Sequence, residues 1–294
     1  MGFSLKSLNR EQHVLLAGPT ASGKSALAME IAAAQNRVIV NADALQVFSD
    51  WRVLTARPTE KDEAALPHAL YGHVPGTESY SVGHWLRDVA PLLSRPSVIV
   101  GGTGLYFTAL TDGLAEIPAT PDHVRATAMA RIAADGADAL LGELDNKTAA
   151  RIDRQNPMRI QRAWEVLTAT GRGLADWQDE TGPPLLALAH AQPLLIDAPK
   201  DWLTPRIEQR FDLMLEQGAL EEARTNAPTW LPDQPSAKAI GAAELIAHVR
   251  GEMSLDDARE ASIIATRQYA KRQRSWFRAR MKGWFVVDTR SFAD

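Results

Sequence analysis

Short, wholly apolar runs alternate along the first part of the chain with stretches in which apolar residues recur at helical spacing. The runs predict buried strands at residues 14–17, 38–40 and 97–100. Helical spacing follows at residues 26–32, 81–93 and 105–110. Repeated strand–helix units favour a parallel, doubly wound sheet, in which the active groups gather at the carboxyl ends of the strands.

The pattern changes near residue 117, where prolines precede an alanine-rich helical stretch that extends to about residue 144. A further helix is expected over residues 157–170, with Asn156 as its N-cap and Gly171 at its end. The predicted domains are a sheet-containing core at residues 1–116 and 191–294 and an all-helical insertion at residues 117–190.

After the insertion, strand and helix patterns return. Apolar runs predict a strand at residues 193–197 and a final strand at 284–287. A helix is expected from residue 202 to 217, because Gly218 is a suitable C-terminal residue. A long helix is expected from Ser254, which stands at capping distance from Asp257, to about residue 282.

Composition narrows the class of protein. The 294 residues are 45% hydrophobic and 23% charged, which is the balance of a soluble globular chain. The sequence contains no run of about eighteen apolar residues and no apolar signal core, so we expect neither a membrane span nor secretion. Because the chain has no cysteine, disulfides and cysteine-based zinc sites are excluded. We expect a cytoplasmic location.

The strongest motif lies between the first predicted strand and the first predicted helix. Its residues are Gly18, Pro19, Thr20, Ala21, Ser22, Gly23, Lys24 and Ser25. Glycines let backbone N–H groups surround an oxyanion at a helix N-terminus, a lysine adds a charge at the terminal phosphate, and a serine hydroxyl binds Mg²⁺. An ordinary glycine turn is the alternative, but the spacing, the Lys-Ser ending and both flanking elements favour phosphate binding.

Two further polar residues follow predicted strands and should meet this loop at the same edge of the sheet. Asp43 follows the second strand, where a carboxylate can bind Mg²⁺, act as a general base, or simply cap a turn. Thr103 follows the third strand, and its small neighbours would let a phosphate approach its hydroxyl. That strand ends without the aspartate that usually binds Mg²⁺ in NTPases, which counts against ordinary ATP hydrolysis.

Arg206 and Arg210 stand four residues apart on a predicted helix, where an arginine would neutralise a departing phosphate group. The alternative is a surface arginine paired with Glu208 or Asp212. None of the histidines shows metal-ligand spacing on a recognisable helix. Structural or surface roles are therefore predicted for the histidines at residues 68, 73 and 84.

Although the net charge is −4, the sequence contains two clusters of basic residues. The first contains Lys147, Arg151, Arg154, Arg159, Arg162 and Arg172. The second contains Arg259, Arg267, Lys271, Arg272, Arg274, Arg278, Arg280 and Lys282, with aromatic residues between them. Cations interleaved with aromatic rings suit nucleic-acid backbones and unstacked bases, whereas the plainer interpretation is a pair of solvated helix faces.

Taken together, these blocks resemble the tRNA dimethylallyltransferases, also called isopentenyl-tRNA transferases, and the resemblance covers nearly the whole chain. The matching blocks are residues 18–25, 43–48, 55–58, 101–107, 156–166, 206–211 and 265–278. The resemblance implies a P-loop parallel sheet flanked by helices, with an all-helical insertion domain. So many ordered blocks make chance similarity implausible, whereas the phosphate motif alone would be weak evidence.

The resemblance also implies a particular use of the phosphate loop. The loop would hold the diphosphate of dimethylallyl diphosphate with Mg²⁺, for which Ser25 is the expected protein ligand. The acceptor would be N6 of the adenosine immediately 3′ of the anticodon in tRNA. Asp43 matches the general base of the family, while Thr103 and Arg210 match residues beside the reacting diphosphate. A monomer is expected.

Several residues are expected at the tRNA, where the insertion would grip the anticodon stem-loop. They are Asp43, Ala44, Leu45, Gln46, Thr103, Arg125, Met158, Arg159, Ile160, Gln161, Arg162, Lys238, Lys271 and Arg274. Four positions depart from the family pattern. Ala44 replaces the usual serine, Phe48 replaces tyrosine, and Ala242 and Ala243 replace an aromatic and a basic residue.

Two rival functions share some of these features. A P-loop small-molecule kinase would share the phosphate motif and the parallel sheet, but it would leave the basic clusters and the helical insertion unexplained. A non-catalytic RNA-binding ATPase or chaperone would account for the basic clusters without needing Asp43.

Overall fold

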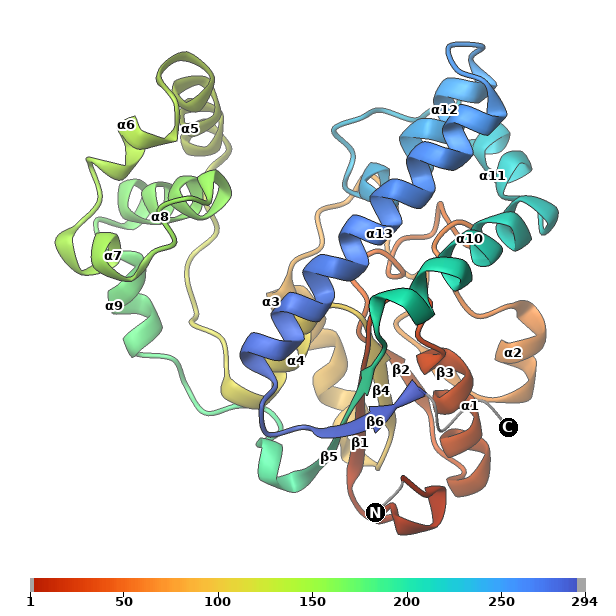
Figure 1. The fold of residues 1–294 in the computed structure, drawn as a ribbon. Helices are drawn as coiled ribbons and strands as arrows, with labels where there is room; N and C mark the ends of the chain where they lie inside the picture. The colour runs from red at the N-terminus through yellow and green to blue at the C-terminus, as the bar shows by residue number, and fades with distance from the viewer. Residues whose placement is uncertain (1–2, 290–294) are drawn as a thin grey trace. The chain divides into compact units, whose positions relative to one another are not determined.

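The computed structural model describes residues 3–289, and the chain divides into two compact units (Figure 1). The first unit comprises Met1–Thr111 and Leu185–Asp294, and the second comprises Asp112–Pro184. The predicted insertion, 117–190, therefore begins and ends several residues later than the second unit. Residues 185–190 belong to the first unit because the Leu186 N–H donates to the Leu110 carbonyl at 3.1 Å and Leu188 packs against its core.

The first unit is built on a six-stranded sheet in the order β3-β2-β4-β1-β5-β6, in which every neighbouring pair is parallel. The strands are β1 (His13–Ala17), β2 (Ile39–Asn41), β3 (His68–Ala69), β4 (Val98–Gly101), β5 (Ala191–Asp197) and β6 (Phe285–Asp288). All residues of β1, β2 and β4 are buried, which is why these strands appear as continuous apolar runs. The predicted parallel sheet is confirmed.

The helices of the first unit surround this sheet and extend beyond its carboxyl edge. They are α1 (Lys24–Gln35), α2 (Glu60–Ala65), α3 (Val82–Val89), α4 (Gly104–Asp112), α10 (Lys200–Glu216), α11 (Ala219–Asn226), α12 (Ala242–Val249) and α13 (Leu255–Arg280). Single 3-10 turns are η1 (Leu5–Ser7), η2 (Ala90–Ser94), η3 (Leu188–His190) and η4 (Pro235–Lys238). The predicted helix 81–93 is divided into α3 and η2, because Pro91 has no N–H to continue an α-helix.

Alternate residues of β1 enter different hydrophobic clusters on the two faces of the sheet. Val14 and Leu16 pack with Ile31 of α1, whereas Leu15 packs with Phe277 of α13. A third cluster joins α10, α12 and α13 and contains Trp51, Leu203, Ile207, Phe211, Leu245, Ile246 and Ile263. The buried contacts of this cluster hold α10 and α13 beside the loops that follow the strands.

The second unit is entirely helical in its regular structure. Its helices are α5 (Asp122–Asp135), α6 (Ala137–Leu141), α7 (Asn146–Arg151), α8 (Pro157–Thr170) and α9 (Leu174–Asp179). The Asn156 side chain caps α8 by accepting the Arg159 N–H, and Gly171 ends the helix with a φ of 70°. The alanine-rich stretch is two helices, because Gly136 adopts a φ of 80° between them.

No helix in residues 3–289 combines the length and apolar character needed to cross a bilayer.

Candidate active site at the carboxyl edge of the sheet

The phosphate motif forms the turn between β1 and α1. Ala21 and Gly23 adopt positive φ angles of 60° and 86°, the backbone geometry that turns successive N–H groups toward an anion. Gly23 is the N-cap of α1 and provides no side chain to bond the first N–H groups of the helix. These donors, and the positive end of the helix dipole, are therefore available to a phosphate.

Lys24 begins α1, and the residue is buried, with 9% of its surface exposed. The ammonium group donates to the Pro19 carbonyl at 3.4 Å. Burial, together with the nearby Arg210 guanidinium, lowers the pKa of Lys24 to about 8, although the Asp43 carboxylate acts in the opposite direction. Burial likewise lowers the pKa of Arg210. Two enclosed cations beside one carboxylate make the site electropositive, so an anionic ligand is favoured there.

Asp43 is held by the residue that ends β2. Its N–H donates to Asn41 Oδ1 at 2.8 Å, and Asn41 Nδ2 donates to the carbonyls of Asp43 and Leu70 at 3.0 and 2.9 Å. Asp43 Oδ1 accepts the Leu45 N–H at 3.0 Å, whereas Oδ2 accepts no hydrogen bond from the described residues. A fixed carboxylate with one free oxygen is the arrangement that a general base requires.

Thr103 joins the loop after β4 to the loop that carries Asp43. Its Oγ1 accepts the Ala44 N–H at 2.9 Å, and its own N–H donates to the Ala42 carbonyl at 3.2 Å. A Cβ at Gly101 would lie 2.0 Å from the Ala42 carbonyl oxygen, so no larger residue fits. The small residues around Thr103 therefore allow close packing between two loops of the protein.

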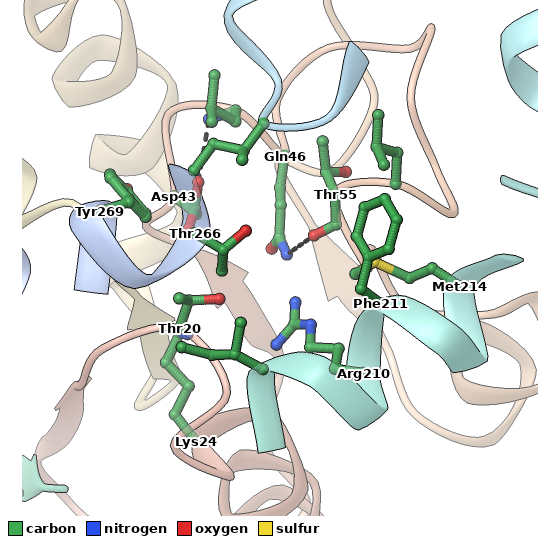
Figure 2. A pocket seen from close by; sticks show the side chains of 14 residues that line it. Thr20, Lys24, Asp43, Gln46, Thr55, Arg210, Phe211, Met214, Thr266 and Tyr269 are labelled. Carbon is green, nitrogen blue, oxygen red and sulfur yellow. Dashed lines mark hydrogen bonds between the residues drawn. The ribbon is translucent and has the colours of Figure 1, made fainter. Parts of the chain in front are cut away.

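Lys24, Asp43 and Arg210 meet in one pocket, shown from close by in Figure 2, whereas Thr103 is not among the residues that line it. Its polar lining consists of Thr20, Lys24, Asp43, Gln46, Thr55, Arg210, Thr266 and Tyr269. Its apolar lining consists of Leu45, Leu54, Ile207, Phe211, Met214 and Ile240. Gln46 closes one wall by donating to the Thr55 and Ala56 carbonyls at 2.8 and 3.1 Å. A pocket with cations at one side and aliphatic groups at another suits an amphipathic anion.

The two arginines of α10 have different surroundings. Arg210 lines the pocket, whereas the Arg206 guanidinium lies 3.7 Å from the centre of the Trp202 ring. Neither pairs with the predicted surface partners, because Asp212 accepts from Arg259 at 2.5 Å and Glu208 pairs with Arg267. The predicted surface pair is therefore absent, and Arg210 lines the pocket instead.

The three histidines for which structural or surface roles were predicted make contacts within the first unit. His68 bonds the Leu66 carbonyl at 2.8 Å, His73 lies 3.4 Å from Asp88, and His84 forms the capping box of α3 with Ser81. No group of three or more His, Cys, Asp or Glu side chains that could hold a metal occurs within residues 3–289.

The residues expected at the tRNA are distributed over both units. In the second unit, Arg125, Met158 and Arg159 are exposed, with Met158 at 71%. Ile160 is only 1% exposed and packs in the hydrophobic core of its unit, so its side chain cannot contact a nucleic acid. Its position in a helix explains this, since it lies on the face shared with Ala163 and Trp164.

Two neighbours of Ile160 are partly engaged within the second unit. Gln161 donates to Glu165 at 2.8 Å, and Arg162 donates to Thr120 Oγ1 at 2.5 Å while lying 3.9 Å from Glu165. In the first unit, Lys238 and Lys271 are exposed, and Arg274 is half-buried on α13. The exposed side chains can make phosphate contacts without rearrangement.

The fold and the pocket define a class: an α/β protein with a phosphate-binding type of loop at the carboxyl edge of a parallel sheet and a cavity for an amphipathic anion. Two protein-family models match this chain. The IPP transferase model matches residues 46–280, and the isopentenyl transferase model matches residues 11–66. The chain belongs to the tRNA dimethylallyltransferase family.

Individual relatives lead to the same family. The tRNA dimethylallyltransferase of Dinoroseobacter shibae is 63% identical over 287 residues, which span 96% of this chain and 97% of the relative. That of Paracoccus denitrificans is 56% identical over 288 residues, spanning 95% of both chains. The predicted family resemblance is thus confirmed, and the kinase alternative is not favoured.

Solved structures confirm the fold. The tRNA isopentenylpyrophosphate transferase of Bacillus halodurans matches with a TM-score of 0.65 at 30% identity, covering 95% of this chain and 90% of that one. A eukaryotic dimethylallyltransferase acting on tRNA matches with a TM-score of 0.80 at 23% identity, covering 95% and 74%. The predicted α/β architecture therefore recurs in this family over almost the whole chain.

Proposed function

We propose that the protein transfers the dimethylallyl group of dimethylallyl diphosphate to N6 of the adenosine immediately 3′ of the anticodon in tRNA, releasing diphosphate. The observation that carries this proposal is a single pocket in which Lys24 and Arg210 face the Asp43 carboxylate beside an apolar wall. The names of the relatives, tRNA dimethylallyltransferases, support tRNA as the acceptor molecule.

The donor has a charged diphosphate and an apolar dimethylallyl group, and the pocket has a charged part and an apolar part to match them. Its diphosphate would lie in the loop of residues 18–25, close to Lys24 and Arg210, because only these groups supply positive charge there. Its dimethylallyl group would lie against Leu54, Phe211 and Met214 on the apolar side. A bound diphosphate would raise the lowered pKa of Lys24, since a nearby anion favours the protonated ammonium.

The acceptor amine needs a base, because its lone pair is delocalised into the purine ring. The N6–carbon bond forms at C1 of the donor while the bond from C1 to the diphosphate oxygen breaks. Asp43 takes the N6 proton on its free oxygen as the new bond forms. Negative charge grows on the departing diphosphate, where Lys24 and Arg210 stabilise it. Thr103 fixes the Asp43 loop through the Ala44 N–H.

Magnesium is proposed as the cofactor. Mg²⁺ usually keeps several waters and binds to substrate phosphates with few protein ligands, rather than in an all-protein cage. The Ser25 hydroxyl, exposed in the first turn of α1, is the ligand that a phosphate loop of this type supplies. Bound with the diphosphate, the ion would neutralise charge on the leaving group.

The tRNA must present its adenine outside the stack. Unstacking a base costs about a few kcal/mol, so the enzyme has to gain that energy from contacts with the rest of the anticodon stem-loop. The exposed cations of α13, Lys271 among them, and Arg125 and Arg159 in the second unit would supply phosphate contacts. We further propose that the protein acts as a monomer in the cytoplasm.

The test uses purified full-length protein, Mg²⁺, radiolabelled dimethylallyl diphosphate and unmodified tRNA. Label appearing in tRNA, and only when all components are present, supports the proposal. A parallel reaction with ATP and small metabolites tests the kinase alternative. Phosphorylation of a metabolite with no label in tRNA would refute prenyl transfer.

A further inference from the structure

One polar side chain of α13 is buried between the two loops that form the proposed site. Gln273 is 5% exposed. Its Oε1 accepts the Thr20 N–H at 2.9 Å, and its Nε2 donates to the Gly102 carbonyl at 3.0 Å. Both functions of the amide are therefore engaged, each with a different loop, and burial makes each bond costly to lose.

The two partners of Gln273 belong to opposite sides of the reaction. Thr20 is in the phosphate loop and lines the pocket with Lys24. Gly102 directly precedes Thr103, whose Oγ1 holds the loop of Asp43 through the Ala44 N–H. A single amide thus links the backbone beside the leaving group to the backbone beside the base.

The contact between α13 and the segment after β4 requires glycine at two positions of that segment. A Cβ at Gly102 would lie 2.2 Å from Gln273 Nε2, and a Cβ at Gly104 would lie 2.1 Å from the Trp276 ring of the same helix. Glycine at these positions lets α13 approach the loop. One turn earlier on α13, Tyr269 lines the pocket together with Thr20. Two turns of the helix therefore lie beside the pocket and the Gly102 loop.

We propose that Gln273 is a positioning residue that sets the distance between the diphosphate site and the Asp43 carboxylate. The inference rests on the proposed function. Because the amide touches neither reacting group, its loss should misplace the two sites relative to each other and leave the donor pocket itself intact. Misplacement of about 1 Å costs on the order of 100-fold in rate. The effect should therefore appear in kcat rather than in the KM of the donor.

Two substitutions separate positioning from simple packing. Gln273→Met keeps the volume and removes both hydrogen bonds; we expect kcat to fall by about 10- to 100-fold, with the donor KM changed by less than about threefold. Gln273→Glu keeps the acceptor for the Thr20 N–H, but its ionised form places negative charge against the Gly102 carbonyl. Protonation restores an O–H donor to that carbonyl.

The decisive readout is the kcat of Gln273→Glu divided by that of the unmodified enzyme at each pH, which cancels the titration of groups common to both. We expect the ratio to rise as the pH falls, because the protonated acid reproduces the amide pattern. Gln268→Glu, at an exposed position of α13, is the control and should give a flat ratio. Thermal denaturation of each variant checks that it is folded.

Separate results distinguish this inference from the proposed function. If the unmodified protein transfers no dimethylallyl group, the proposed function itself is wrong. If it does, a kcat for Gln273→Met within about twofold of the unmodified enzyme overturns the positioning role. Should Gln273→Met fail to fold, a pH-independent ratio for Gln273→Glu overturns the role on its own.

Discussion

Basic side chains gather in both units of the molecule, but their acidic partners differ. In the second unit, Lys147 lies 2.6 Å from Asp176 and 2.7 Å from Asp179, and Arg151 lies 2.6 Å from Asp179. Arg172 likewise pairs with Glu180 at 2.5 Å. In the C-terminal part of α13 and in the turn that follows it, six cations have no carboxylate within ion-pair distance among the described residues. These are Lys271, Arg272, Arg274, Arg278, Arg280 and Lys282.

The difference changes which surface can attract a phosphate backbone. Hydrogen bonds from Arg151 and Lys147 lower the pKa of Asp179 to about 2, so its carboxylate stays ionised near neutral pH and cancels local positive potential. The six cations at the C-terminal end of α13 and just after it are not cancelled in this way, whereas Arg259 and Arg267 earlier on the helix pair with Asp212 and Glu208. Two clusters of similar composition are thus unequal, and α13 is the stronger candidate for tRNA phosphates.

The pocket also contains cations that nearby carboxylates do not fully neutralise. Lys24 and Arg210 are enclosed and face the single carboxylate of Asp43. Their positive charge is expensive to bury, and a diphosphate relieves that cost. The first unit therefore holds unneutralised cations in two places, at the pocket and along α13, which can be altered independently.

Replacing Asp43 should have the largest effect. In Asp43→Asn the N6 proton has no acceptor, and we expect kcat to fall by about 10²- to 10⁴-fold, the usual contribution of a general base. Affinity for tRNA should change little, because the phosphate-binding cations are elsewhere. Single-turnover transfer and filter binding measure the two quantities. Equal losses in rate and in tRNA affinity would contradict the separation of pocket from binding surface.

Lys24→Met tests how much the buried charge of Lys24 contributes to donor binding and how much it lowers the free energy of unfolding. Losing a charge-assisted bond of about 1.5–3 kcal/mol should weaken donor binding by about 10- to 100-fold, as measured by calorimetry. The ligand-free variant should nevertheless be more stable at neutral pH, by on the order of 3 kcal/mol if the whole pKa shift is recovered.

The pH dependence of that gain has a definite sign. The folded-state pKa of Lys24, about 8, is below its ordinary value of 10.5, so the unfolded chain binds more protons between these two values. The free energy of unfolding of the unmodified protein therefore rises through that window relative to Lys24→Met. A stability difference that is constant from pH 7 to pH 10.5 would show that Lys24 is not desolvated.

Removing two cations from α13 should have an intermediate effect. Lys271→Ala combined with Arg274→Ala should weaken tRNA binding by about 10-fold and reduce the slope of log affinity against log salt by about 1 to 2. Filter binding at several salt concentrations gives both values. An unchanged slope would remove these side chains from the interface.

The matched pair of changes in the second unit should have the smallest effect. Lys147→Ala combined with Arg151→Ala removes the same charge, yet we expect tRNA affinity to stay within about twofold, because those cations already pair with Asp176 and Asp179. Arg159→Ala, an exposed cation on α8 of the same unit, should weaken binding more. If both variants matched the α13 variant, internal pairing would not decide which cluster binds.

Much of the site could be predicted from the sequence because it follows the ends of strands. The phosphate loop, Asp43 and Thr103 come directly after β1, β2 and β4, and a parallel sheet brings these ends together. The role of Arg210 could be predicted only from the family resemblance, because helical spacing alone also allowed a surface pair with Glu208 or Asp212.

Other features depend on contacts between residues far apart in the chain. Gln273 lies in a run of basic residues, and nothing local reveals that its partners are Thr20 and Gly102, 253 and 171 residues away. The short strand β3 contains no apolar run and exists because it pairs with β2. By contrast, the burial of Ile160 could have been deduced from its helical spacing to Ala163 and Trp164.

The most direct measurement is mass spectrometry of the nucleosides of unmodified tRNA after incubation with the protein, Mg²⁺ and dimethylallyl diphosphate. The account predicts N6-dimethylallyl adenosine at the nucleotide 3′ of the anticodon, and its absence when Asp43→Asn replaces the unmodified protein. An unchanged set of nucleosides, or the same product formed equally well by Asp43→Asn, would contradict it.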